Sequence, residues 1–177
     1  MTLATHAAVG GAVAALFPSH PITAFIAGFM SHFVLDAIPH WDYKILSAYA
    51  NSDIAMSANA DQAGVSEKFQ ADKNFKLDLL RTGTDGLLGV ILVLLIWQPS
   101  TISQLYILAL GALGGVLPDF LQFVYMRFPH QPMVALQKFH SFIHAKYRLN
   151  DTPVIGILFQ VLTIVAVTAL VNYLRFL

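Results

Sequence analysis

Apolar residues are gathered into five runs along the chain, separated by short turns or by longer polar stretches. The runs cover residues 3–17, 21–38, 85–97, 102–118 and 153–174. The last run contains no charged residue and is long enough to cross the hydrocarbon core of a bilayer. The first and third are short, although their small residues suit close packing within a helix bundle. A half-buried helix that does not cross is the alternative for each of these two.

The polar stretches complete the expected organisation. The stretch between the second and third apolar runs carries little periodicity and predicts a loop. The stretch between the fourth and fifth runs mixes aromatic and cationic residues and predicts amphipathic helices in the membrane interface, broken at Pro129 and Pro132. The prediction is an all-α, polytopic membrane helix bundle with about five transmembrane helices, forming one domain over residues 1–177. Its parts are a first hairpin (1–43), a cytoplasmic loop (44–82), a second hairpin (83–125), an interfacial segment (126–151) and a C-terminal transmembrane helix (152–177).

Composition supports an integral membrane protein and excludes several classes of chemistry. The chain is 56% hydrophobic and 11% charged, far from the composition of a soluble domain. A net charge of zero gives no reason to expect a nucleic-acid partner. Without cysteine, a metal site must be built from histidine and carboxylate. No basic segment precedes the first apolar run, which argues against a cleaved signal peptide.

The distribution of Lys and Arg predicts an orientation, provided that all five runs cross. Only Arg175 then lies on the far side of the membrane. By the positive-inside rule, the N-terminus and both long loops face the cytoplasm. The other nine Lys and Arg residues lie in the two polar stretches: Lys44, Lys68, Lys73, Lys76, Arg81, Arg127, Lys138, Lys146 and Arg148.

This orientation also brings most histidines and several aspartates to one membrane face. Ionisable groups at membrane depth are costly and are typical of functional sites. Imidazole and carboxylate without thiolate suit a divalent metal, zinc first, with manganese, iron or magnesium as alternatives. The i,i+4 pairs His32/Asp36 and His140/His144 each project from one helical face. The candidate metal ligands are His6, His32, Asp36, His40, Asp119, His140 and His144, and the candidate catalytic residues are Asp42 and Asp85.

Some of these residues have simpler explanations. Asp85 follows Gly83 and Thr84 at an expected helix start, where a carboxylate caps a helix as readily as it binds a ligand. Asp119 follows Pro118 and could likewise begin a helix. Capping therefore stays open for both aspartates.

A weak internal repeat links the two hairpins. In the first copy, His6 is followed by Gly28, His32 and Asp36. The matching positions of the second copy are, in the same order, Asp85, Gly111, Gly115 and Asp119. Both copies start and finish on the same membrane face with polar residues. Packed about a pseudo-twofold axis normal to the membrane, they would bring four polar helix ends together.

Three short blocks carry a resemblance to a known family. They are Ser31–Asp36 (SHFVLD), Gly114–Asp119 (GGVLPD) and Phe139–His144 (FHSFIH). These blocks resemble motifs of bacterial membrane-bound metal-dependent hydrolases related to the LexA-regulated inner-membrane hydrolase, a group linked by motif to zinc-dependent phospholipase C. The chain departs from the family at Leu121, where a second acid is usual, and in the order of the blocks. The resemblance implies metal-dependent hydrolysis at the bacterial inner membrane.

The leading hypothesis is a metal-dependent hydrolase that acts on a phosphoester of a membrane lipid at the cytoplasmic face. Asp42 or Asp85 would serve as general base. One alternative is a non-enzymatic membrane protein that binds or transports a metal ion or proton. Another is a structural membrane protein whose polar residues only cap helices and form hydrogen bonds.

Overall fold

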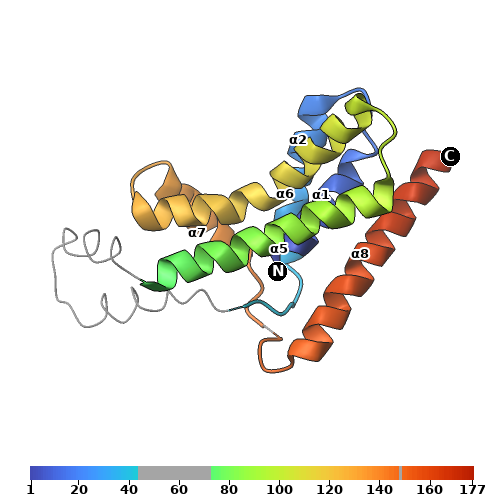
Figure 1. Cartoon of the computed structure of the whole chain (residues 1–177). Helices are drawn as coiled ribbons and strands as arrows, with labels where there is room; N and C mark the ends of the chain where they lie inside the picture. Colours follow the sequence, from blue (N-terminus) through green and yellow to red (C-terminus); the bar gives the residue numbers. More distant parts are fainter. Residues whose placement is uncertain (44–72, 148) are drawn as a thin grey trace, which may run out of the picture.

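The computed structural model describes residues 1–43, 73–147 and 149–177, and all of the regular structure in these ranges is helical (Figure 1). The all-α prediction is therefore confirmed. Of the loop predicted over residues 44–82, the part from 44 to 72 lies outside the described residues. The helices are α1 (Leu3–Ala14), α2 (Pro21–Asp36), α5 (Lys73–Trp97), α6 (Ile102–Arg127), α7 (Met133–Ile143) and α8 (Pro153–Phe176).

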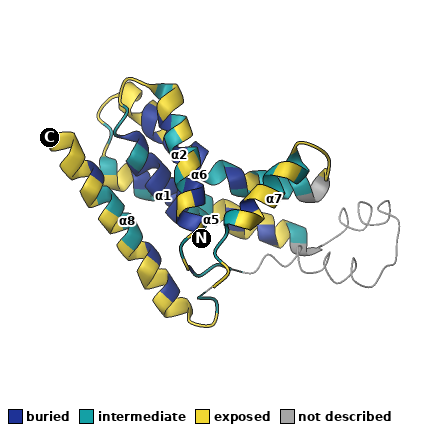
Figure 2. Ribbon diagram, turned by 180° about the vertical axis from the view of Figure 1, so that it is seen from behind, coloured by how far each residue is buried: buried dark blue, intermediate teal, exposed yellow. Residues whose placement is uncertain are grey.

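Three of the helices have the length and composition of membrane spans. They cover Phe75–Trp97, Ile102–Tyr125 and Pro153–Phe176, while α1 and α2 are shorter apolar helices. Many large apolar side chains on the long helices are exposed, and Figure 2 shows α8 exposed over most of its surface. Exposed apolar surface of this extent suits contact with lipid rather than with water. The fold thus indicates a membrane protein.

Two helix boundaries differ from the prediction. Helix α5 begins at Lys73, inside the range expected to be a loop, and α6 continues through Pro118 to Arg127. The first turns of α5 contain charged residues on different faces, since Asp78 is buried whereas Arg81 is exposed. A search for continuous apolar runs therefore misses these turns. Because both helices extend past these points, neither Asp85 nor Asp119 caps the start of its own helix, and that alternative was wrong.

Helix α6 packs closely against α1 and α2 through glycine. A Cβ at Gly10 of α1 or at Gly28 of α2 would meet the backbone carbonyl of Gly111, and a Cβ at Gly115 would meet the carbonyl of His6. Backbones approach this closely only where side chains are absent. Gly28 and Gly111, matched positions of the internal repeat, therefore lie in contact, as packed hairpins require.

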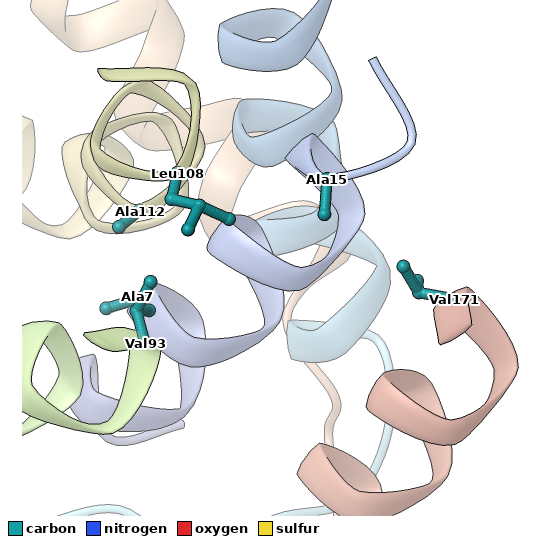
Figure 3. Packing of buried hydrophobic residues seen from close by; sticks show 6 residues of the cluster. All are labelled: Ala7, Ala15, Val93, Leu108, Ala112 and Val171. Carbon is teal, nitrogen blue, oxygen red and sulfur yellow. The ribbon is translucent and has the colours of Figure 1, made fainter. Parts of the chain in front are cut away.

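A small apolar core joins α1 to the long helices (Figure 3). It is formed by Ala7, Ala15, Val93, Leu108, Ala112 and Val171, which lie in α1, directly after it, and in α5, α6 and α8. Helix α8 begins beside Trp41, against which Gly156 packs, and ends where Arg175 lies over Trp97. The start of α8 thus lies at the end of the bundle that carries Trp41, and its last turn lies at the opposite end, beside Trp97.

The break predicted between α6 and an amphipathic segment is confirmed. Helix α6 ends at Arg127, and α7 begins at Met133, directly after Pro132. One face of α7 carries the buried His140, whereas Phe139 and Phe142 are exposed. An apolar residue pair beside a buried polar one suits a helix at the edge of a membrane.

Candidate metal centre

Asp36, the last residue of α2, lies at the centre of a buried histidine cluster. Its Oδ2 is 2.8 Å from Nε2 of His140 and 3.1 Å from Nε2 of His32. Its Oδ1 is 3.2 Å from Nε2 of His6. The Asp36 side chain is only 1% exposed, and those of His6 and His32 are fully buried. Helices α1, α2 and α7 therefore converge on one carboxylate.

The backbone sets the orientation of two of these imidazoles. Nδ1 of His32 lies 2.8 Å from the carbonyl oxygen of Gly115, and Nδ1 of His40 lies 2.7 Å from that of Ile38. A carbonyl oxygen can only accept a hydrogen bond, so each Nδ1 carries the proton and donates it. In the neutral rings Nε2 then presents a lone pair toward Asp36. This is the tautomer and orientation found in metal-binding histidines.

One group of four side chains has spacings suited to a single ion. His32, Asp36, Asp119 and His140 each offer a ligand atom, and these atoms all lie within 4.8 Å of one another. Oδ1 of Asp119 is 3.7 Å from Nε2 of both histidines, whose Nε2 atoms are 3.3 Å apart. Tetrahedral zinc with bonds of about 2.0–2.1 Å places its ligand atoms about 3.3 Å apart. The group could therefore hold a divalent metal ion.

A second group shares Asp36 with the first. His40 and His144 place Nε2 at 3.8 Å and 3.9 Å from opposite oxygens of the Asp36 carboxylate. Together with Asp36 they form a further set that could hold an ion. Asp36 belongs to both groups, so its carboxylate could serve two neighbouring ions.

His6 has no hydrogen bond that explains its burial. Its ring stacks on His32 with the centroids 3.9 Å apart, and neither ring nitrogen makes a hydrogen bond within the described residues. Its Nε2 nevertheless lies 3.9 Å from Oδ2 of Asp119 as well as close to Asp36. A buried ring that makes no hydrogen bond is uncommon and calls for an explanation, such as an ion. The remaining histidines, His20 and His130, are exposed and lie outside the cluster.

Asp42 lies at the more open edge of the cluster. A cavity of about 20 Å³, room for about one water molecule, is lined by Asp42, Asp119 and Tyr43 among others. Burial raises the pKa of Asp42 to about 6, and burial likewise raises the pKa of Tyr43. Oδ2 of Asp42 is 4.0 Å from the backbone nitrogen of Met1, which itself contacts Asp36. Asp42 therefore borders the candidate site without forming part of either ligand group.

Asp85 is set apart from the cluster. Its Oδ2 accepts hydrogen bonds from the backbone N–H of Leu3, at 2.6 Å, and from the hydroxyl of Tyr43, at 3.3 Å. The carboxylate of α5 thus binds the first turn of α1, where N–H groups lack partners within the helix. These contacts favour an anchoring role for Asp85 over the predicted role of general base.

Sequence reasoning missed Gln160. This amide lies in α8 and accepts hydrogen bonds from the N–H and hydroxyl of Thr2 and from the hydroxyl of Thr5, while it donates to the carbonyl of Trp41. It is 3% exposed. An amide inside a strongly apolar segment was the signal available in the sequence. Gln160 holds α8 against the segments that carry His6 and His40.

We expect Gln160→Leu to lower the free energy of unfolding by about 1–3 kcal/mol, because it leaves the donors of Thr2 and Thr5 buried without an acceptor. Equilibrium unfolding in detergent, followed by circular dichroism, measures this change. Asn172→Leu, at an exposed position on the same helix, is the matched control and should change stability by less than about 0.5 kcal/mol. Equal effects of the two substitutions would contradict the assigned role.

No family model, curated protein or solved structure among those compared with the chain matches it. The resemblance to membrane-bound metal-dependent hydrolases therefore stays an expectation.

Proposed function

We propose that the protein is a metal-dependent hydrolase that cleaves a phosphoester of a membrane lipid at the cytoplasmic face of the bacterial inner membrane. The observation that carries the proposal is the orientation of the imidazoles around Asp36. His32 donates its Nδ1 proton to a backbone carbonyl and directs Nε2 at the carboxylate from 3.1 Å. Two lone pairs repel at this distance, so either a second proton on the ring or a cation shared by the two groups has to account for the contact.

A divalent metal accounts for this arrangement better than protons do. Five imidazoles place Nε2 within 3.9 Å of an Asp36 oxygen. The lone pairs of one carboxylate are too few to accept a hydrogen bond from every one of these rings. Charging several rings together in a buried site would add desolvation and mutual repulsion. A bound ion instead uses the Nε2 lone pairs as ligands. It would activate water for nucleophilic attack and neutralise charge on phosphoryl oxygens.

The residues at the open edge supply the remaining functions. Asp42 borders the one-water cavity and is placed to accept the proton of the attacking water. Hydrolysis then breaks the P–O ester bond and leaves an alcohol and a phosphate. Lys138 and Lys146 are exposed on and after α7 and could attract the anionic headgroup. Where α1 and α2 cross together with the three longer helices, the excess of Lys and Arg in the two polar stretches supports placing this face in the cytoplasm.

The test combines metal analysis with an assay on defined lipids. Protein purified in detergent is analysed for bound metals and incubated with phosphatidylglycerol or phosphatidic acid in mixed micelles, and products are followed by ³¹P NMR. We expect bound zinc or another divalent metal, hydrolysis of at least one lipid, loss of hydrolysis on chelation and recovery on metal addition. Metal-free protein that hydrolyses these lipids would refute the metal mechanism. Metal flux in proteoliposomes without hydrolysis would support the transport alternative instead.

Asp42→Asn separates the proposed base from the metal ligands. We expect kcat to fall by about 10²- to 10⁴-fold, because the substituted amide cannot accept the proton. Bound metal should stay at the wild-type level, since Asp42 belongs to neither ligand group. Parallel measurements of kcat and metal content check this, and a variant that loses its metal would reassign Asp42 as a ligand.

A further inference from the structure

The opposite end of the bundle contains a larger cavity. It has a volume of about 180 Å³ and lies where α1 ends, where α5 turns into α6 and where α8 finishes. Ala15 and Leu108, members of the apolar core in Figure 3, form part of its wall. The His/Asp cluster is built from the other ends of α1 and α2, so the two sites are separate.

Three polar side chains that line this cavity can offer donors. The guanidinium carbon of Arg175 lies 5.3 Å from the centre of the Trp97 ring, and the two side chains line the cavity together. Nε1 of Trp97 is buried and donates no hydrogen bond within the described part of the chain. Oε1 of Gln104 accepts from the backbone N–H and the hydroxyl of Ser100, which leaves the amide N–H groups as the end able to donate to a ligand.

Charge decides the class of ligand. The lining residues include one cation and no Asp or Glu. A guanidinium, an indole N–H and an amide N–H favour an anion with several acceptor oxygens. A single cation matches a single negative charge, such as that of a phosphodiester.

The location of the cavity indicates that the anion belongs to a lipid. The cavity lies at the ends of the three helices that have the length of membrane spans, where Trp and Arg residues are typical of the interface with lipid headgroups. Its apolar wall offers a surface on which the glycerol and the first carbons of an acyl chain can pack. A soluble anion would gain nothing from this wall.

We propose that this cavity binds the phosphodiester headgroup of an anionic phospholipid, with Arg175 as counterion and with Trp97 and Gln104 as hydrogen-bond donors. It is a second lipid site on the membrane surface opposite the His/Asp cluster. This assignment is independent of the proposed hydrolase activity, because no residue of the cavity belongs to the metal groups.

Trp97 provides the probe. The chain has two tryptophans, so a Trp41→Phe background leaves Trp97 as the sole indole. We expect phosphatidylglycerol in detergent to shift the Trp97 emission saturably, whereas phosphatidylcholine and inorganic phosphate bind at least about fivefold more weakly. Arg175→Gln should weaken phosphatidylglycerol binding by about fivefold or more.

Arg81→Gln removes an exposed cation from α5 and serves as the matched control, with unchanged binding expected. Gln104→Leu provides a second variant should Arg175→Gln fail to fold, which circular dichroism reveals. Bound metal should be the same in all these variants, so that failure of the metal proposal is seen separately. Equal binding of the two lipids, equal effects of Arg175→Gln and Arg81→Gln, or saturation by inorganic phosphate at the same concentration would each overturn the proposal.

Discussion

Replacing Asp36 by asparagine should remove the bound metal and reduce hydrolysis by about 10³-fold or more, equivalent to about 4 kcal/mol in the activation free energy. Asparagine keeps the size of the side chain but loses the charge and one of the two carboxylate oxygens. Both candidate ligand groups contain Asp36, so a single substitution damages both. Elemental analysis and the lipid assay, carried out on one preparation, measure the two effects together.

Asp151→Asn is the matched control for this substitution. Asp151 is exposed in the turn before α8 and lies in neither ligand group. We expect it to leave metal content and hydrolysis at the wild-type level. Circular dichroism and size-exclusion profiles establish that each variant is folded. An Asp36→Asn protein that is folded and keeps its full complement of metal would show that the cluster is not the metal site.

The second large effect concerns the packing of α6. We expect Gly111→Ala to lower the free energy of unfolding by about 1–3 kcal/mol or more, as overpacked sites do. A Cβ there would overlap the side chain of Ala14 and the carbonyl of Gly10, so α1 and α6 would have to separate. Because the cluster spans both helices, metal affinity should fall as well. Unfolding in detergent and metal titration test these two results.

Gly83→Ala makes the same chemical change on α5 where nothing lies within 4 Å of an added Cβ. Alanine is a better helix former than glycine by about 1 kcal/mol, so this variant should be slightly more stable than the wild type. The two alanine variants are thus expected to change stability in opposite directions. Destabilisation of both by similar amounts would mean that close packing at Gly111 is not the cause.

The general class of fold could be predicted from hydropathy, whereas the helix limits could not. Long apolar runs predicted α6 and α8, because in lipid the backbone must satisfy its hydrogen bonds within each segment. The start of α5 was missed because its first turns are amphipathic and carry Asp78 on the buried side. Pro118 suggested an end of helix, but α6 continues through it, packed against α1 and α2 at Gly115 and Gly114. Tertiary contacts therefore overrode a local signal.

The members of the histidine cluster could be predicted in large part, because one end of the helix bundle collects them whatever the details of packing. The i,i+4 spacing correctly placed His32 beside Asp36, which is 3.1 Å away. Contacts between distant segments could not be predicted in the same way. Gln160 lies in α8 and Gly115 in α6, and their roles depend on which faces of packed helices meet. Asp85 illustrates the same limit, since its partner Leu3 belongs to another helix.

The placement of Asp36 has an energetic consequence for the whole chain. As the last residue of α2 it stands at the negative end of the helix macrodipole, where an ionised carboxylate is disfavoured by about 0.3–1 kcal/mol. Residues chosen for stability alone would place a cation or a glycine there. The helix end thus disfavours the charge of Asp36, and that cost is offset by the imidazoles that α1, α2 and α7 place around it. Such a local conflict between helix electrostatics and residue choice is characteristic of a site maintained for function.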